Sequence, residues 1–207
     1  MSGGRNALGY RDPTASMAIA SAERSRKGAQ SRTAGGYFES VIEASLEWYR
    51  ARGTAHIEKT PEPMKPLGKP NRSGQFLACY TKAGQPDFKG TLDGGRSVVF
   101  EAKHTDTDRI DHGRLTKEQF DGLELHYSMG AVSFVLVSFG LADFFRIPFE
   151  DWRDMKSLFG RKYITREECE RYRVPYMAGV IKMLNGIETG RRCSHERIDE
   201  NHPPGEL

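Results

Sequence analysis

Residues 86–103 have the sequence PDFKGTLDGGRSVVFEAK and predict two β-strands joined by a tight turn. Residues 87–92 and 97–103 have the length and composition of short strands. Residues 93–96, Asp-Gly-Gly-Arg, are typical of a β-hairpin turn, because glycine adopts the positive φ angles that such turns need. The hairpin therefore decides how the polar residues at its open end are arranged.

Three charged residues stand at that open end. Asp87 begins the first strand and Glu101 lies near the end of the second, so the turn brings the two carboxylates toward each other. Glu101 and Lys103 are two residues apart, and side chains alternate along a strand, so both project from the same face. We expect two carboxylates and one lysine to converge on one point.

This set of residue types has a specific chemical use. Carboxylates bind hard divalent cations such as Mg²⁺, which can acidify a water molecule and neutralise charge on a phosphate. A neighbouring lysine can orient the attacking water or stabilise the developing charge. The alternative is a surface hairpin with a solvated Glu-Lys pair. The apolar run Val98–Phe100 directly before the charges favours the hypothesis of metal-assisted phosphodiester hydrolysis.

The remaining periodicity predicts a mixed α/β domain. Apolar side chains recur at helical spacing in residues 37–50, and Thr116 with Gln119 forms a capping box at the start of a second predicted helix. The expected elements are helices over 37–50 and 115–129 and strands over 55–59, 76–82, 87–92, 97–103, 131–139 and 143–147. Strands that alternate with helices indicate a sheet with helical layers.

Composition excludes several classes of protein. The net charge of the 207 residues is only +3, which does not identify a nucleic-acid-binding protein. No apolar run reaches the roughly 20 residues of a membrane helix, and no secretory signal core is present. Three cysteines suggest neither a disulfide framework nor a four-ligand zinc site, and Cys193 with His195 lacks a second ligand pair. We expect a cytoplasmic protein without a membrane partner.

Several motifs, in order over about residues 34–180, resemble the PD-(D/E)XK nucleases of the restriction-endonuclease-like superfamily, and among them the RecU-type Holliday junction resolvases. The motifs are residues 36–39, 57–63, 87–90, 100–103, 130–139, 147–148 and 161–164, with Ile42, Thr105 and Gln119. The resemblance implies a mixed sheet flanked by helices, with a projecting stalk. It also implies a homodimer that cuts four-way DNA junctions with paired symmetric nicks, using Mg²⁺ or Mn²⁺.

The same resemblance assigns roles to individual residues. Asp87 and Glu101 would bind the metal together with the Ala102 carbonyl, and Lys103 would activate water or stabilise charge. Glu39 in the first helix and Gln119 in the second would lie at the edge of the site. The chain departs from the family at Gln85, Phe88 and Glu118, where threonine, tyrosine and histidine are common.

Simpler interpretations of the outer residues stay open. Glu39 also fits a solvated stripe with Glu43 and Glu47, and Gln119 also fits the capping box with Thr116. The histidines and aspartates of residues 104–112 suggest a flexible polar loop more than a metal site.

The Pro-rich segment at about residues 60–82 corresponds to the family's stalk. Its basic and aromatic side chains could contact phosphates and stack on bases at the branch point, although an ordinary long loop is the alternative. These candidate DNA-binding residues are Lys65, Lys69, Arg72, Phe76, Tyr80 and Lys82.

The domain organisation follows from these assignments. Residues 1–33 predict a disordered basic arm with a net charge of 6 − 2 = +4. Residues 34–180 would form the nuclease domain, and residues 181–207 a polar tail. The leading hypothesis is a junction-resolving endodeoxyribonuclease. The alternatives are a nuclease of the same fold that acts on duplex or flap DNA, and a junction-binding protein without catalysis.

Overall fold

The computed structural model describes residues 33–61, 64–80 and 85–188. Its main sheet has five strands in the order β1-β4-β5-β7-β8, and all neighbours are antiparallel except β5 and β7. The strands are β1 (Ala55–Lys59), β4 (Phe88–Leu92), β5 (Ser97–Thr105), β7 (Val132–Phe139) and β8 (Asp143–Pro148). The predicted mixed α/β class is confirmed.

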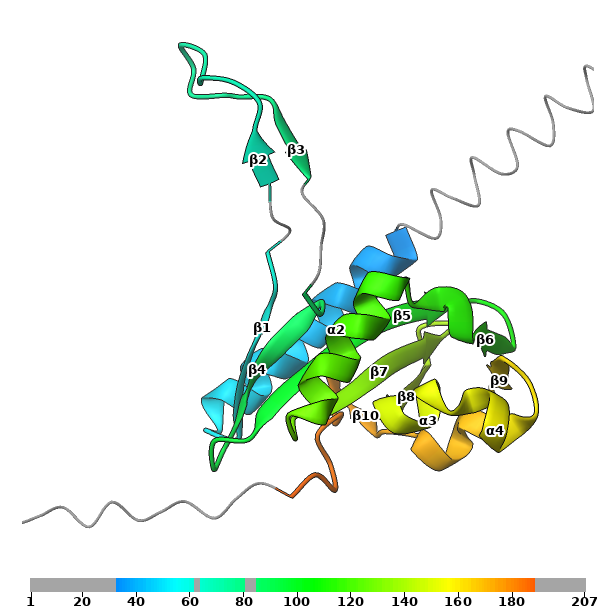
Figure 1. Ribbon diagram of the computed structural model, residues 1–207. Helices are drawn as coiled ribbons and strands as arrows, with labels where there is room; N and C mark the ends of the chain where they lie inside the picture. The colour runs from blue at the N-terminus through cyan, green and yellow to red at the C-terminus, as the bar shows by residue number, and fades with distance from the viewer. Residues whose placement is uncertain (1–32, 62–63, 81–84, 189–207) are drawn as a thin grey trace, which may run out of the picture.

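Helices cover both faces of this sheet (Figure 1). The first helix, residues 33–51, packs on one face, and the second face carries the remaining helices. These are α2 (Lys117–Ser128), α3 (Phe149–Arg153) and α4 (Met155–Phe159). Phe134 and Leu136 of β7 join the core under the first helix, whereas Val135 and Val137 join the core on the other side. Six of the eight residues of β7 are apolar, as expected for a strand that is buried on both faces.

The pairing of β4 with β5 stops before β5 ends. The ladder runs from Thr91 opposite Ser97 to Phe88 opposite Phe100. On its other side, β5 stays paired with β7 as far as Thr105. Beyond Phe100, the edge of β5 that faced β4 is therefore left open to side chains.

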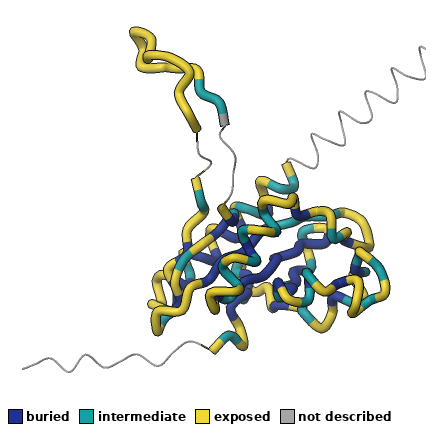
Figure 2. Tube along the Cα trace, in the orientation of Figure 1, coloured by how far each residue is buried: buried dark blue, intermediate teal, exposed yellow. Residues whose placement is uncertain are grey.

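A two-stranded hairpin stands away from the sheet and its helices (Figure 1). It consists of β2 (Met64–Pro66) and β3 (Ala78–Tyr80), within the predicted stalk. Residues 64–77 are exposed along their whole length (Figure 2). The expectation of a projecting Pro-rich segment is thus confirmed for its described part.

The prediction of a flexible polar loop at residues 104–112 is wrong. Strand β6 (Arg109–Asp111) pairs with β9 (Tyr163–Thr165), and the 3₁₀-helix η1 (His112–Arg114) follows. One buried isoleucine in each strand, Ile110 and Ile164, anchors this small sheet in the core below α2. The polar residues around Ile110 hid it from the sequence pattern.

The predicted boundary of the C-terminal tail at residue 181 is also wrong. Ile181, Met183 and Leu184 are buried in the core under the first helix. The segment before them contains η2 (Glu168–Tyr172), β10 (Tyr176–Met177) and β11 (Val180–Ile181). The later part of the tail and the basic arm up to residue 32 lie outside the described residues, and residue 33 is already helical. None of the described helices is long and apolar enough to cross a membrane.

Candidate active site

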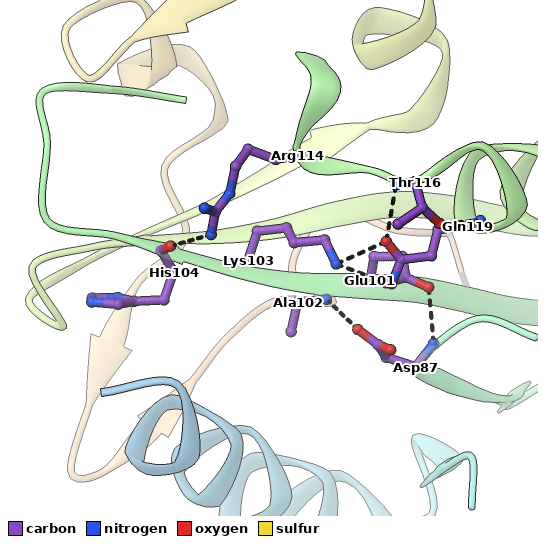
Figure 3. Close-up of polar contacts among 8 residues, drawn as sticks. All are labelled: Asp87, Glu101, Ala102, Lys103, His104, Arg114, Thr116 and Gln119. Carbon is purple, nitrogen blue, oxygen red and sulfur yellow. Dashed lines mark hydrogen bonds and ion pairs between the residues drawn. The ribbon is translucent and has the colours of Figure 1, made fainter. Parts of the chain in front are cut away.

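The two predicted carboxylates meet at the open edge of β5 (Figure 3). Asp87 directly precedes β4, and its backbone N–H donates to Oε1 of Glu101 at 3.1 Å. The Ala102 backbone N–H in turn donates to Oδ2 of Asp87 at 3.4 Å. The hairpin therefore produces the predicted convergence, and Asp87 occupies the place that a neighbouring strand would have taken.

Glu101 is the buried member of the pair. Its side chain is fully buried, which is rare for a carboxylate without compensation. Burial, the largest cause, acts together with the hydrogen bond and charge of Asp87 to raise the pKa of Glu101 to about 8, against the opposing effect of Lys103. Two carboxyl groups held this close are favourable only when a proton or a cation lies between them.

Lys103 is fixed by two acceptors. Its ammonium donates to Oε2 of Glu101 and to Oε1 of Gln119, each at 3.1 Å. Because a lysine ammonium has three N–H donors, one remains for a further partner. The side chain is only 13% exposed, so the ammonium lies in a defined place at the mouth of the site.

Gln119 satisfies both interpretations of its role. It completes the capping box, since the Thr116 backbone N–H donates to its Oε1 at 3.2 Å and its own N–H donates to Thr116 Oγ1 at 3.3 Å. The same Oε1 accepts from Lys103. The start of α2 therefore positions the lysine of β5.

The donor set fits a hard divalent cation. The N–H and C=O of one residue lie on the same edge of a strand, so the Ala102 carbonyl faces the edge where its N–H meets Asp87. Two carboxylates and a carbonyl, completed by water and phosphate oxygens, are typical ligands of Mg²⁺. Among the described residues, no group of three or more His, Cys, Asp or Glu side chains could hold a metal. The site therefore resembles a Mg²⁺ site that water and substrate phosphate complete, more than a structural site closed by protein ligands.

Glu39 lies on the helix that covers the opposite face of the sheet. Its carboxylate accepts from the Lys59 ammonium at 2.6 Å, and in the described part of the chain Glu39 forms no hydrogen bond with Asp87 or Glu101. The hydrogen bond from Glu39 is the main cause that raises the pKa of Lys59, and Asp87 adds to it. Lys59 thus links Glu39 electrostatically to the site. The alternation of Ala55, Ile57 and Lys59 in β1 could have identified this link from the sequence.

The candidate DNA-binding residues that the structure describes belong to the hairpin, which stands away from the main sheet (Figure 1). Lys65, Lys69, Arg72 and Phe76 are exposed on the hairpin, and residues 64–80 contain no acidic residue. Only the backbone of Tyr80 is described, as part of β3, and Lys82 lies outside the described residues. The charged side chains of the described hairpin are therefore all basic.

A family model described as "RecU: Recombination protein U" matches residues 33–188. The chain belongs to the RecU family. Two relatives named Holliday junction resolvase RecU come from Geobacillus kaustophilus (strain HTA426) and Geobacillus thermodenitrificans (strain NG80-2). They are 27% and 28% identical over 143 and 145 residues, which is 65% of this chain and 71% of each relative. The resemblance inferred from the motifs is thus confirmed.

One solved structure is also similar to this RecU-family chain. It is Hjc, a Holliday junction resolvase from Archaeoglobus fulgidus, with 15% sequence identity and a TM-score of 0.35. The match covers 56% of this chain and 73% of Hjc.

Proposed function

We propose that this chain is a metal-dependent endodeoxyribonuclease that resolves four-way DNA junctions by paired symmetric nicks. The observation that carries the proposal is the constellation of Asp87, Glu101 and Lys103 at the open edge of β5. The names of the two Geobacillus relatives support junctions as the substrate. A protein that only bound DNA would have no use for two adjacent carboxylates facing phosphates.

In this proposal Asp87, Glu101 and the Ala102 carbonyl hold one divalent cation, Mg²⁺ or Mn²⁺. When bound, that cation supplies an acidified water and neutralises charge on the phosphate. Lys103 directs its remaining N–H toward the attacking water or the charged phosphate oxygens. Gln119 keeps the lysine in place, and Glu39 acts at a distance through Lys59.

The hairpin provides selectivity for branched DNA in the same proposal. Lys65, Lys69, Arg72 and Lys82 contact phosphates, and Phe76 and Tyr80 stack on bases that are unpaired at the branch point. The base of the hairpin is tied to the catalytic residues, because the Thr60 N–H donates to the Asp87 carbonyl at 2.8 Å. Two copies related by a twofold axis would place two sites on opposite strands, which explains paired nicks.

A cleavage assay tests this function. The protein is incubated with labelled four-way junction, duplex and flap DNA, with Mg²⁺ or Mn²⁺ and separately with chelator. We expect metal-dependent nicks in the junction alone. Equal cutting of plain duplex would favour the general nuclease, and binding without metal-dependent nicking would favour the non-catalytic binder.

Single variants test the residues. Asp87→Asn and Lys103→Ala are expected to lose cleavage while junction binding remains. Lys156→Ala removes an exposed lysine of α4 and serves as the control that cuts normally. Normal cutting by Asp87→Asn and by Lys103→Ala would refute the assigned site.

A further inference from the structure

The open edge of β5 continues past Ala102, whose N–H meets Asp87. Alternate residues of a strand present their N–H and C=O to the same edge, so His104 faces the same side as Ala102. The Arg114 guanidinium uses this position, since its Nη2 donates to the His104 carbonyl at 3.0 Å. Asp87 and Arg114 are therefore neighbours along one edge, on either side of Lys103 in the order of the strand.

Arg114 approaches from the catalytic face of the sheet. It ends η1, and the next residue, Leu115, is buried in the core on the side of α2. Lys103 contacts Gln119 of α2 and so lies on that side as well. Figure 3 draws Arg114 and Lys103 on the same side of the β5 ribbon. The geometry puts a second cationic side chain at the mouth of the site.

The guanidinium is available for a ligand. Arg114 is exposed, and within the described residues it forms no ion pair with a carboxylate. A guanidinium has five N–H donors in a planar fork that matches two oxygens of a phosphate, and the bond to His104 uses one of them. The bond to the carbonyl orients the fork without neutralising its charge.

We propose that Arg114 binds a backbone phosphate of the cleaved strand, next to the phosphodiester that is cut. The inference rests on the proposed function and adds a residue that fixes the register of the strand over Lys103. The need for such a cation follows from the charges of the site, where two carboxylates face the DNA and Lys103 is held by one of them. A strand that approaches these carboxylates gains from an unneutralised arginine beside them.

Arg96 provides a matched control at the other end of the same strand. Arg96 is exposed, and its Nε donates to the Gly130 carbonyl at 3.1 Å. It directly precedes the first residue of β5, whereas Arg114 contacts His104 near the last residue. Both arginines thus make one hydrogen bond to a backbone carbonyl, and only Arg114 lies at the catalytic edge. Any general effect of the loss of a surface arginine should be equal in Arg96→Ala and Arg114→Ala.

The test measures junction binding against salt concentration by fluorescence anisotropy, with Asp87→Asn as the non-cutting parent. The logarithm of the association constant falls as log [NaCl] rises, and loss of one phosphate contact makes this slope less steep by about 0.9. We expect this reduction, with roughly tenfold weaker binding at low salt, for Arg114→Ala and Arg114→Gln. Arg114→Lys and Arg96→Ala should keep the parent slope. The glutamine can retain the bond to His104 without the charge, so it separates the electrostatic role from a structural one.

The outcomes separate this inference from the function on which it rests. If the wild-type chain cuts junctions and Arg114→Gln has the parent slope, the phosphate contact is refuted and the nuclease stands. If Arg96→Ala changes the slope as much as Arg114→Ala does, the effect is general and the inference again fails. If the wild-type chain neither binds nor cuts junctions, the proposed function fails and the inference with it.

Discussion

Replacement of Glu101 by glutamine is expected to stabilise the protein at alkaline pH when divalent cations are removed. The folded-state pKa of Glu101 lies at about 8, above its ordinary 4.5, because the group is buried beside Asp87. The native protein therefore keeps a proton that the unfolded chain releases. The stability that this group contributes is fully present below pH 4.5 and is lost as the pH rises through about 8.

The magnitude follows from the same pKa. The interval between 4.5 and about 8 corresponds to a loss on the order of 4–5 kcal/mol when Glu101 is fully ionised. A neutral glutamine has no such loss, so Glu101→Gln and the wild type should differ little at pH 5. At pH 9 the variant should be more stable by several kcal/mol, roughly the loss estimated above.

Urea denaturation in the presence of chelator measures this difference at the two pH values. Glu58→Gln removes an exposed carboxylate of β1 but keeps Glu101, so its difference in stability from the wild type should be the same at both pH values. If Glu101→Gln is less stable than the wild type at pH 9, the idea that the ionised Glu101 and Asp87 repel each other is refuted. Addition of Mg²⁺ or Mn²⁺ at a hundred times its Kd should then stabilise the wild type by about 2.7 kcal/mol, and Glu101→Gln by much less.

Three further predictions concern the fold and the hairpin. A chain that ends at residue 180 lacks three buried side chains, each of which stabilises the fold by about 1.5–3 kcal/mol, and should not fold. A chain that ends at residue 188 keeps them and should melt like the full chain, and circular dichroism distinguishes the two. Gly90→Ala places a Cβ 2.0 Å from the His56 carbonyl oxygen and should destabilise the protein by about 3 kcal/mol or more, while the exposed Thr91→Ala melts normally. Phe76→Ala should weaken junction binding by about 1–3 kcal/mol without a change in thermal stability, because Phe76 is 53% exposed; equal affinity would exclude stacking.

The parts of the fold that the sequence predicted are those with local patterns. The strand predicted over residues 55–59 has these bounds in the structure, and the Asp-Gly-Gly-Arg turn joins β4 and β5. The largely apolar run of residues 131–139 predicted the strand that the structure shows as β7, with side chains in both cores. In each case the residues that decide the structure are consecutive or alternate within one short segment.

The C-terminal segment could not be predicted in this way. Strands β10 and β11 have two residues each, too few for a periodic pattern. The first helix holds this segment through polar side chains, since the Ile181 N–H donates to Ser45 Oγ at 2.9 Å and the Leu184 N–H donates to the Tyr49 hydroxyl at 3.0 Å. Ser45 and Tyr49 lie on the apolar side of the helix, where the sequence pattern describes them only as part of a buried face.

The candidate site was predictable in its residues and less so in its geometry. The hairpin placed Asp87 near Glu101, and alternation placed Lys103 on the side of Glu101. The open edge of β5 depends on where its pairing with β4 stops, which no local pattern specifies. For this reason Arg114, whose contact lies on that edge, has no sequence pattern that marks it.

The two carboxylates are held together by the core directly beneath them. Phe88 follows Asp87 and Phe100 precedes Glu101, and these two phenylalanines are directly paired across β4 and β5. Their rings stack at 4.7 Å, and the Phe100 ring stacks on Phe134 of β7 at 4.7 Å as well. Adjacent residues of a strand point to opposite faces, so this apolar ladder fills one face while the acidic pair occupies the other. The burial of three rings therefore helps the sheet to keep the two carboxyl groups adjacent before any cation arrives, while Glu101 retains its proton.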